Sequence, residues 1–133
     1  MKDNTRLAIY ARDELSAAEY AAYPPRAHIL RQVLALRPAA CVRVVSGAWC
    51  SDCRREVPRF ARIAERLTGW TVELLGDDAE TRARFRIERI PTFVVEDPAS
   101  GRELGRIVER PETGSLEGDL LAIAERHPSQ MMA

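Results

Sequence analysis

This chain of 133 residues has no net charge, no apolar run long enough to span a membrane and no apolar core of signal-peptide length. Each of these absences excludes a class of function. The 20 basic and 20 acidic side chains cancel, so no overall field would attract nucleic acid or an anionic membrane. No stretch approaches the roughly 20 consecutive apolar residues of a membrane span. No apolar core of signal-peptide length follows the N-terminal residues, since charges already occur at positions 12–14. The sequence therefore favours a cytoplasmic protein that binds neither nucleic acid nor membrane.

Lysine is almost absent, because Lys2 is the single lysine beside 19 arginines. The arginines are interleaved with acidic residues along the chain and do not gather in one block. We interpret them as a solvated, ion-paired surface whose arginine bias reflects genome composition and not the recognition of a partner.

Cysteine and histidine are also scarce, and their spacing argues against a metal centre. Cys50 and Cys53 form one Cys-x-x-Cys pair, but a tetrahedral zinc site needs a second pair of ligands. The remaining candidates, Cys41, His28 and His127, are scattered along the chain, and Cys41 is most simply a buried, inert thiol, with a regulatory role as the alternative. A purely structural disulfide is disfavoured, because so short a ring removes little entropy from the unfolded chain. Thiol–disulfide chemistry is the favoured interpretation of the pair.

The pair lies at the junction of a strand and a helix. Residues 41–46 include a short β-branched run that is typical of a buried strand. Residues three apart on a helix have their α-carbons about 5 to 5.5 Å apart, within the range that a disulfide tolerates. The unpaired N–H groups at the helix start favour a thiolate on Cys50, which is therefore the predicted nucleophile. The helix is indicated by apolar residues at helical spacing: Val57, Phe60, Ile63, Ala64 and Leu67.

Charged side chains near the pair act in opposite directions. Asp52 adds negative charge close to the thiols and opposes a thiolate, whereas Arg54 and Arg55 favour one. Asp52 also suits the first turn of a helix, where the helix dipole favours a carboxylate. We expect Asp52 either to stabilise the helix start or to take part in proton transfer.

A second motif, Ile90-Pro91-Thr92, precedes another apolar run. Together the two motifs resemble the thioredoxin family over roughly residues 40–126. The Ser51-Asp52 dipeptide is similar to the subset of the family whose motif reads Trp-Cys-x-Asp-Cys, where many thioredoxins carry Gly-Pro. The residues that match the family pattern are Trp49, Cys50, Cys53, the helix proline Pro58, Ile90, Pro91 and Thr92.

The resemblance implies roles for residues around the thiols. The Ile90–Pro91 bond would be cis and would pack beside the disulfide, and Ile90 would offer backbone groups to an extended substrate. Trp49 would shield the disulfide and form part of a docking surface. The sequence alone leaves two plainer alternatives open, in which Pro91 is a strand-entry proline and Trp49 is an aromatic packed against the domain.

One departure from the family pattern affects the chemistry. The family's buried acid, six residues before the first cysteine, corresponds to Val44. That acid normally helps to deprotonate the resolving thiol, here Cys53, so another group or solvent has to do so. Asp52 and Glu56 are the nearest carboxylates in sequence, and Glu56 can share a helix face with Cys53. Both are candidates for proton transfer, although a solvated face is the favoured interpretation of Glu56.

The predicted fold class is α/β, a thioredoxin-like fold with a central mixed sheet flanked by helices. We expect an N-terminal helical extension at residues 1–39 packed on a thioredoxin-like domain at residues 40–127, with a tail at residues 128–133. The expected helices are 12–22, 26–36, the redox helix as far as Gly69, 78–85 and 116–126, and the expected strands are 41–46, 70–75, 92–96 and 103–109.

The predicted function is that of a thiol–disulfide oxidoreductase that reduces protein or small-molecule disulfides. Cys50 would attack the substrate and Cys53 would resolve the mixed disulfide. The expected partners are a disulfide substrate and a reductase or glutathione as electron donor, and no organic cofactor or metal is expected. The alternative is a non-catalytic interaction module with a thioredoxin fold, for which Val44 and the N-terminal extension leave room.

Overall fold

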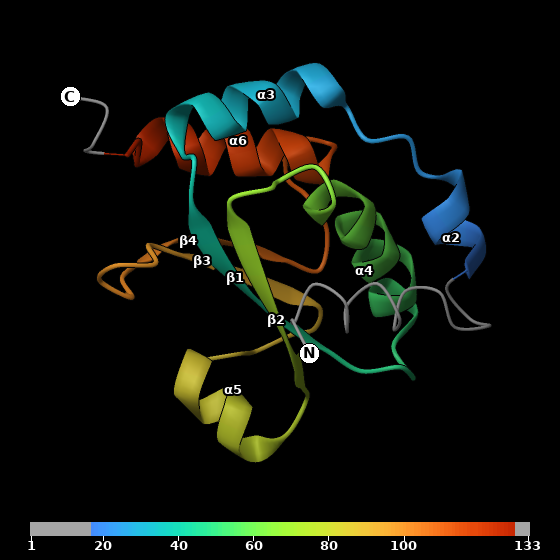
Figure 1. The fold of residues 1–133 in the computed structure, drawn as a ribbon. Helices are drawn as coiled ribbons and strands as arrows, with labels where there is room; N and C mark the ends of the chain where they lie inside the picture. Colours follow the sequence, from blue (N-terminus) through green and yellow to red (C-terminus); the bar gives the residue numbers. More distant parts are fainter. Residues whose placement is uncertain (1–16, 130–133) are drawn as a thin grey trace.

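The computed structural model describes residues 17–129 and contains a mixed four-stranded sheet (Figure 1). The strands lie in the order β2-β1-β3-β4. β1 runs parallel to β2, whereas β3 is antiparallel to both β1 and β4. This arrangement confirms the predicted central mixed sheet. The strand bounds are Ala40–Ser46 for β1, Trp70–Gly76 for β2, Thr92–Glu96 for β3 and Glu103–Val108 for β4.

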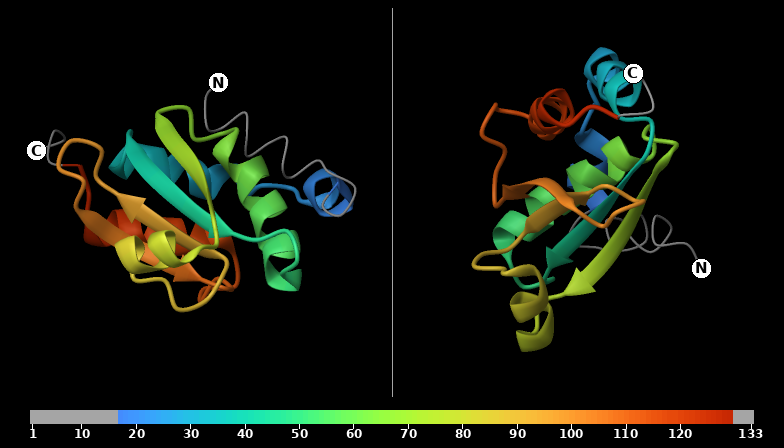
Figure 2. Two further views of the ribbon diagram at one scale, coloured as in Figure 1. Left: turned by 90° about the horizontal axis from the view of Figure 1, so that it is seen from below. Right: turned by 90° about the vertical axis from the view of Figure 1, so that its left-hand side faces the viewer.

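Helices cover both faces of the sheet (Figure 2). α4 and α6 pack on one face, α3 lies beside α6, and α2 packs against α4. α5 lies on the opposite face, where Phe85 joins a separate small cluster. Among residues 17–129, no helix has the length and apolar character needed to cross a membrane. The helix bounds are Ala17–Ala22 for α2, Ala27–Leu36 for α3, Ser51–Ala64 for α4, Ala79–Phe85 for α5 and Leu116–Arg126 for α6.

Alternation along the central strands divides the core into two clusters. Val44 of β1 and Phe93 of β3 belong to the larger cluster, which α4 and α6 cover. Val45 and Val94, the next residues along the two strands, belong to the smaller cluster under α5. Successive side chains of a strand point to opposite faces, so the run of apolar residues supplies both clusters at once.

The helices before β1 complete the larger cluster. Tyr20 of α2 is buried in it, as are Leu30 and Val33 of α3. The Tyr20 hydroxyl also donates a hydrogen bond to the Glu65 carboxylate, just after α4. α2 and α3 therefore share one hydrophobic core with the sheet.

Arg37, which follows α3, joins four parts of the chain. Its Nε donates to the His127 carbonyl at 2.8 Å, and its Nη1 pairs with Asp97 Oδ1 at 3.0 Å. The Arg37 carbonyl accepts the indole N–H of Trp70 at 2.8 Å. Hydrogen bonds from Ser100, together with Arg37, lower the pKa of Asp97 to about 2. The ends of α3 and α6, the start of β2 and the turn between β3 and β4 are thereby held together.

The boundaries of the first and third predicted helices differ from the structure. Of the helix predicted at residues 12–22, residues 12–16 lie outside the described part of the chain, and α2 occupies the rest. The redox helix α4 ends at Ala64, with Glu65 as its C-cap, so the prediction that Gly69 closes it is wrong. Gly69 lies in the turn before β2, where a β-carbon would come within 2.1 Å of the Pro38 carbonyl oxygen. Its requirement for glycine comes from this close approach of two backbone segments.

The last strand is also shorter than predicted. β4 ends at Val108, because Glu109 adopts a left-handed conformation with a φ of 62°. The Glu109 N–H donates to the Pro91 carbonyl at 2.8 Å. This contact turns the chain away from the sheet beside the Ile90–Pro91 bond.

Candidate functional site

Cys50 occupies the N-cap position of α4. Its backbone is extended, and its sulfur accepts the N–H of Cys53 at 3.2 Å. That N–H is one of the donors that a helix start leaves without an intrahelical partner. Cys50 is half-buried, and its Sγ lies 3.7 Å from the Ile90 carbonyl oxygen. It thus combines access with a donor that stabilises negative charge, as a nucleophilic thiol requires.

Cys53 lies in the first turn of α4 and is 0% exposed. Burial raises the pKa of its thiol from 9.0 to about 12, and its hydrogen bond with Cys50 adds to the rise. Hydrogen bonds from the Ser46 side chain and the Gly47 backbone oppose that rise. This pKa applies to the dithiol form, in which both cysteines are free. In this form Cys53 keeps its proton at neutral pH, as a resolving thiol does before a mixed disulfide exists.

The Ile90–Pro91 peptide bond is cis, as the resemblance implied. Pro91 is buried and Ile90 is partly exposed, and the Ile90 carbonyl faces the Cys50 sulfur. The hydrogen bond from Glu109 to the Pro91 carbonyl fixes the other side of this segment. The structure therefore brings the Ile-Pro motif directly beside the first cysteine.

Trp49 is 69% exposed, the largest apolar side chain so open to solvent among the described residues. Its indole lies over Gly47, where a β-carbon would be 2.6 Å from two of the ring atoms. Trp49 is therefore not enclosed in the core, although its ring packs on Gly47 at the surface of the domain. An exposed aromatic ring is the kind of group that anchors a docking partner, and this ring belongs to the residue before Cys50.

Both carboxylates that were candidates for proton transfer are held by Arg55. Arg55 Nη2 pairs with Asp52 Oδ1 at 2.6 Å, and its Nε pairs with Glu56 Oε2 at 2.7 Å. Hydrogen bonds to Glu56 and then to Asp52 raise the pKa of Arg55, so the guanidinium stays charged between them. Glu56 is 3% exposed, and the prediction of a solvated face is wrong for it. Its second oxygen, Oε1, has no hydrogen-bond partner among the described residues.

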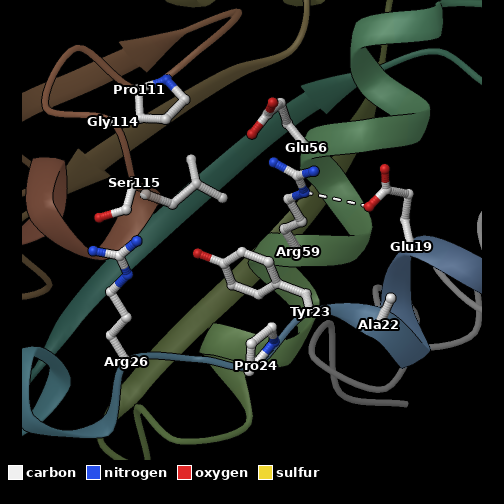
Figure 3. Close-up of a pocket in the computed structure, with 11 residues that line it drawn as sticks. Glu19, Ala22, Tyr23, Pro24, Arg26, Glu56, Arg59, Pro111, Gly114 and Ser115 are labelled. Carbon is white, nitrogen blue, oxygen red and sulfur yellow. Dashed lines mark hydrogen bonds and ion pairs between the residues drawn. The ribbon is translucent and has the colours of Figure 1, made fainter.

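Glu56 lies at the wall of a cavity of about 350 Å³ between α2, α4 and the start of α6 (Figure 3). Glu56 and Arg59 extend from α4, and Tyr23 and Arg26 face them from the segment that joins α2 to α3. Arg59 is paired with Glu19 at 3.3 Å. Neither thiol lines this cavity, and within residues 17–129 no hydrogen bond joins Glu56 to a thiol. The cavity is a separate feature beside the redox helix.

Cys41, His28 and His127 belong to no cluster of metal ligands in the described part of the chain. Within residues 17–129, no group of three or more His, Cys, Asp or Glu side chains is arranged to hold a metal ion. Cys41, at the start of β1, is partly exposed, so the description of a buried thiol is wrong. Like Val45, it points toward the face that α5 covers, but α5 reaches only the opposite end of β1.

Ser46 is the residue of the site that the sequence interpretation missed. It is the last residue of β1 and 5% exposed, and its side chain hydrogen-bonds to Cys53. A usable signal was present in the sequence, because side chains two apart on a strand share a face. Ser46 follows Val44 by two residues, so it points to the same face as the family's acid position, toward α4.

The sequence matches a family model described as thioredoxin over residues 10–116. Among curated proteins, none gives a significant match. Solved structures do match. A protein of unknown function from Pseudomonas aeruginosa has a TM-score of 0.63 at 19% identity, covering 92% of this chain and 84% of that chain. An HIV epitope-scaffold has a TM-score of 0.61 at 20% identity, covering 92% and 82%.

A thioredoxin from Fasciola hepatica has a TM-score of 0.53 at 21% identity, covering 73% of this chain and 88% of that chain. Identities this low show a shared fold, and the fold is the thioredoxin-like one predicted from the motifs. Residues 40–133 make up less than three quarters of the chain, so coverage of 92% extends into the segment before residue 40.

Proposed function

Because this chain belongs to the thioredoxin family, we propose that it is a dithiol–disulfide oxidoreductase that works through Cys50 and Cys53. The observation that carries the proposal is the contrast between the two thiols. Cys50 is half-buried at a helix start with an N–H donor on its sulfur, whereas Cys53 is fully buried and protonated. One thiol is suited to attack a disulfide from solvent, and the other to act only after that attack.

The proposed reaction has two exchange steps. The Cys50 thiolate attacks one sulfur of the substrate disulfide, forms a mixed disulfide and releases the first substrate sulfur as a thiolate, which takes a proton from solvent. Cys53 then loses its proton and attacks the Cys50 sulfur, which releases the second substrate thiol. The substrate gains two electrons and two protons, and the protein is left with a Cys50–Cys53 disulfide.

We place this reaction in the reducing direction, in a cytoplasm, with a flavoprotein reductase or glutathione restoring the dithiol. The substrate is a protein disulfide or a small-molecule disulfide. Trp49 and Ile90, with the buried Pro91 next to Ile90, form the site at which it docks, since the exposed indole belongs to the residue before Cys50 and the Ile90 carbonyl lies 3.7 Å from the Cys50 sulfur. In the two exchange steps, the thiols of Cys50 and Cys53 are the groups of the protein that form and break bonds with the substrate disulfide.

Reduction of insulin disulfides tests the proposal, with dithiothreitol, glutathione, or NADPH and thioredoxin reductase supplied in turn. The parent protein is expected to accelerate reduction with at least one of these donors. Cys50→Ser is expected to be inactive, and Cys41→Ser is the matched control that keeps its activity. Parent protein that behaves like Cys50→Ser with every donor would contradict a reductase role.

A non-catalytic docking module is the second candidate, and the burial of Val44 at the position of the family's acid favours it. Cys53→Ser separates the two candidates. An oxidoreductase with this substitution accumulates mixed disulfides through Cys50, because the second step is blocked. A docking module captures no disulfide substrate covalently.

A further inference from the structure

We propose that Ser46 is a positioning residue for Cys53, and that its hydroxyl and the Gly47 N–H hold the Cys53 sulfur while that sulfur is an attacking thiolate. This inference rests on the proposed function, and it names the group that serves the second exchange step. It gives Ser46 a part of the role that the family assigns to a carboxylate at the position of Val44.

The fold places Ser46 against Cys53 by two independent features. Ser46 ends β1 on the face that carries Val44, and this face is covered by α4. Cys53 lies in the first turn of α4, and only four residues separate the last residue of β1 from the first residue of α4. The strand end and the helix start are thus joined by a loop of Gly47, Ala48 and Trp49 with Cys50 as the cap.

Water does not compete for this contact, because Ser46 is 5% exposed and Cys53 is 0% exposed. A hydrogen bond to a charged group is stronger away from water, and a buried thiolate without donors would be strongly disfavoured. Both donors at the end of β1 oppose the effect of burial on the pKa of Cys53. The end of β1 therefore supplies this sulfur with two donors.

The carboxylates of α4 and β3 are already engaged or lie far from Cys53. On α4, Asp52 and Glu56 both pair with Arg55. The neighbouring strand β3 has Glu96 as its charged residue, and Glu96 lies opposite Cys41 at the other end of β1. Cys50 faces Cys53, but its sulfur carries no charge once it is part of the mixed disulfide.

At that stage the donors on Cys53 are the ones that matter. The Cys53 proton passes to solvent, the Ser46 hydroxyl keeps its own proton and turns it toward the sulfur, and the Cys53 thiolate attacks Cys50. Loss of the hydroxyl slows this second step. The first attack by Cys50 uses the Cys53 N–H instead and does not depend on Ser46.

Stopped-flow mixing with a chromogenic aromatic disulfide separates the two steps in Ser46→Ala and in the matched control Ser51→Ala, which removes an exposed hydroxyl from the same motif. We expect Ser46→Ala to slow resolution about ten-fold or more, because a hydrogen bond to a charged group is worth at least about that factor. The rate of the first attack is expected to match the parent, and Ser51→Ala is expected to match it in both steps. Resolution at the parent rate in Ser46→Ala would overturn the proposal.

A thiol titration gives a readout that does not need activity. In a Cys41→Ser, Cys50→Ser background, Cys53 is the remaining thiol, and its absorbance near the ultraviolet thiolate band is followed against pH. We expect Ser46→Ala to move the midpoint of this titration upward by about one pH unit, because a ten-fold loss of thiolate stability corresponds to one pKa unit. An unchanged titration would overturn the positioning role even if the parent protein reduces insulin. A shifted titration in a protein that reduces nothing would keep Ser46 as the donor to Cys53 and reject the reductase function.

Substitution in a buried site can disturb the fold, so a second pair of variants is included. Ser46→Thr keeps the hydroxyl, and Ser46→Val has nearly the same shape without it. The proposal requires the Thr variant to resolve the mixed disulfide faster than the Val variant. It also requires the Cys53 thiol to titrate at a lower pH in the Thr variant. Equal behaviour of the two would assign the effect to packing and would reject the hydroxyl's role.

Discussion

The indole of Trp49 lies on Gly47, so close that a β-carbon at Gly47 would sit 2.6 Å from two ring carbons. The same glycine contributes a backbone hydrogen bond to the Cys53 sulfur. Gly47 therefore connects the exposed ring beside Cys50 with the buried thiol of Cys53. A change at this position acts on both sides of the site.

Gly47→Ala tests the connection. The added methyl displaces the Trp49 ring from its position over Gly47. Because the ring is 69% exposed, it can move into solvent without much loss of stability. We expect a several-fold rise in KM for a protein disulfide, a changed tryptophan emission spectrum, and a fall in the free energy of unfolding within about 1 kcal/mol. Gly76→Ala is the control, since a β-carbon at Gly76 meets nothing within 4 Å. Identical KM values in the two variants would show that Trp49 is not part of the docking surface.

The three thiols are expected to react with iodoacetamide in a fixed order. Cys50 reacts first, because it is accessible and its sulfur receives an N–H donor. Cys41 follows, since it is partly exposed, and Cys53 is slowest because it is fully buried with a raised pKa. Timed alkylation of the reduced protein followed by peptide mass spectrometry gives the order. Modification of Cys53 before Cys41 in the folded state would contradict this assignment.

The raised pKa of Cys53 predicts a pH dependence of stability in the reduced protein. In the unfolded chain this thiol loses its proton near its ordinary pKa of 9.0, whereas in the folded protein it does so near 12. Between these values the unfolded state binds fewer protons, so the free energy of unfolding falls as the pH rises. Urea unfolding under reductant at several pH values from 9.0 upward measures the slope. Cys53→Ser is expected to show a shallower slope, and parallel slopes would show that Cys53 is not the group responsible.

Asp52→Asn and Glu56→Gln test the two carboxylates as proton acceptors for Cys53. A general base is typically worth about 10² to 10⁴-fold in rate. Because Arg55 holds both carboxylates in ion pairs, we expect each substitution to slow resolution of the mixed disulfide only a few-fold. Stopped-flow kinetics with the chromogenic disulfide measures the second step alone. A loss of 100-fold or more in either variant would assign proton transfer to that carboxylate.

Much of the framework was predictable because short-range patterns determine it. The valines of β1, the Cys-x-x-Cys pair and the Ile-Pro-Thr motif each have a local signature, and the mixed sheet and the cis bond at Pro91 agree with them. Glu56 was misjudged because its burial depends on contacts from distant segments. α2 and the start of α6 close over that side of α4, and Arg55 beside it supplies the partner that makes a buried carboxylate tolerable.

Ser46 and Cys41 show a second reason for the misses. Strand parity assigns each to a face, but parity does not say how far a covering helix extends along that face. α4 begins directly over the end of β1, so Ser46 is enclosed, whereas α5 stops short of the start of β1, so Cys41 is left partly open. The lengths and positions of covering helices are properties of the whole fold.

The contacts of Arg37 limit how this redox motif can be moved between proteins. A fragment beginning at residue 40 would leave the Asp97 carboxylate, the His127 carbonyl and the Trp70 indole without the partner that Arg37 provides. The Trp70 indole is buried, at 3% exposed, and the loss of a buried hydrogen bond there costs about 1 to 3 kcal/mol, which is a sizeable share of the stability of a small domain. A graft of the Cys-x-x-Cys helix and its sheet onto another scaffold would therefore have to carry α3 with it.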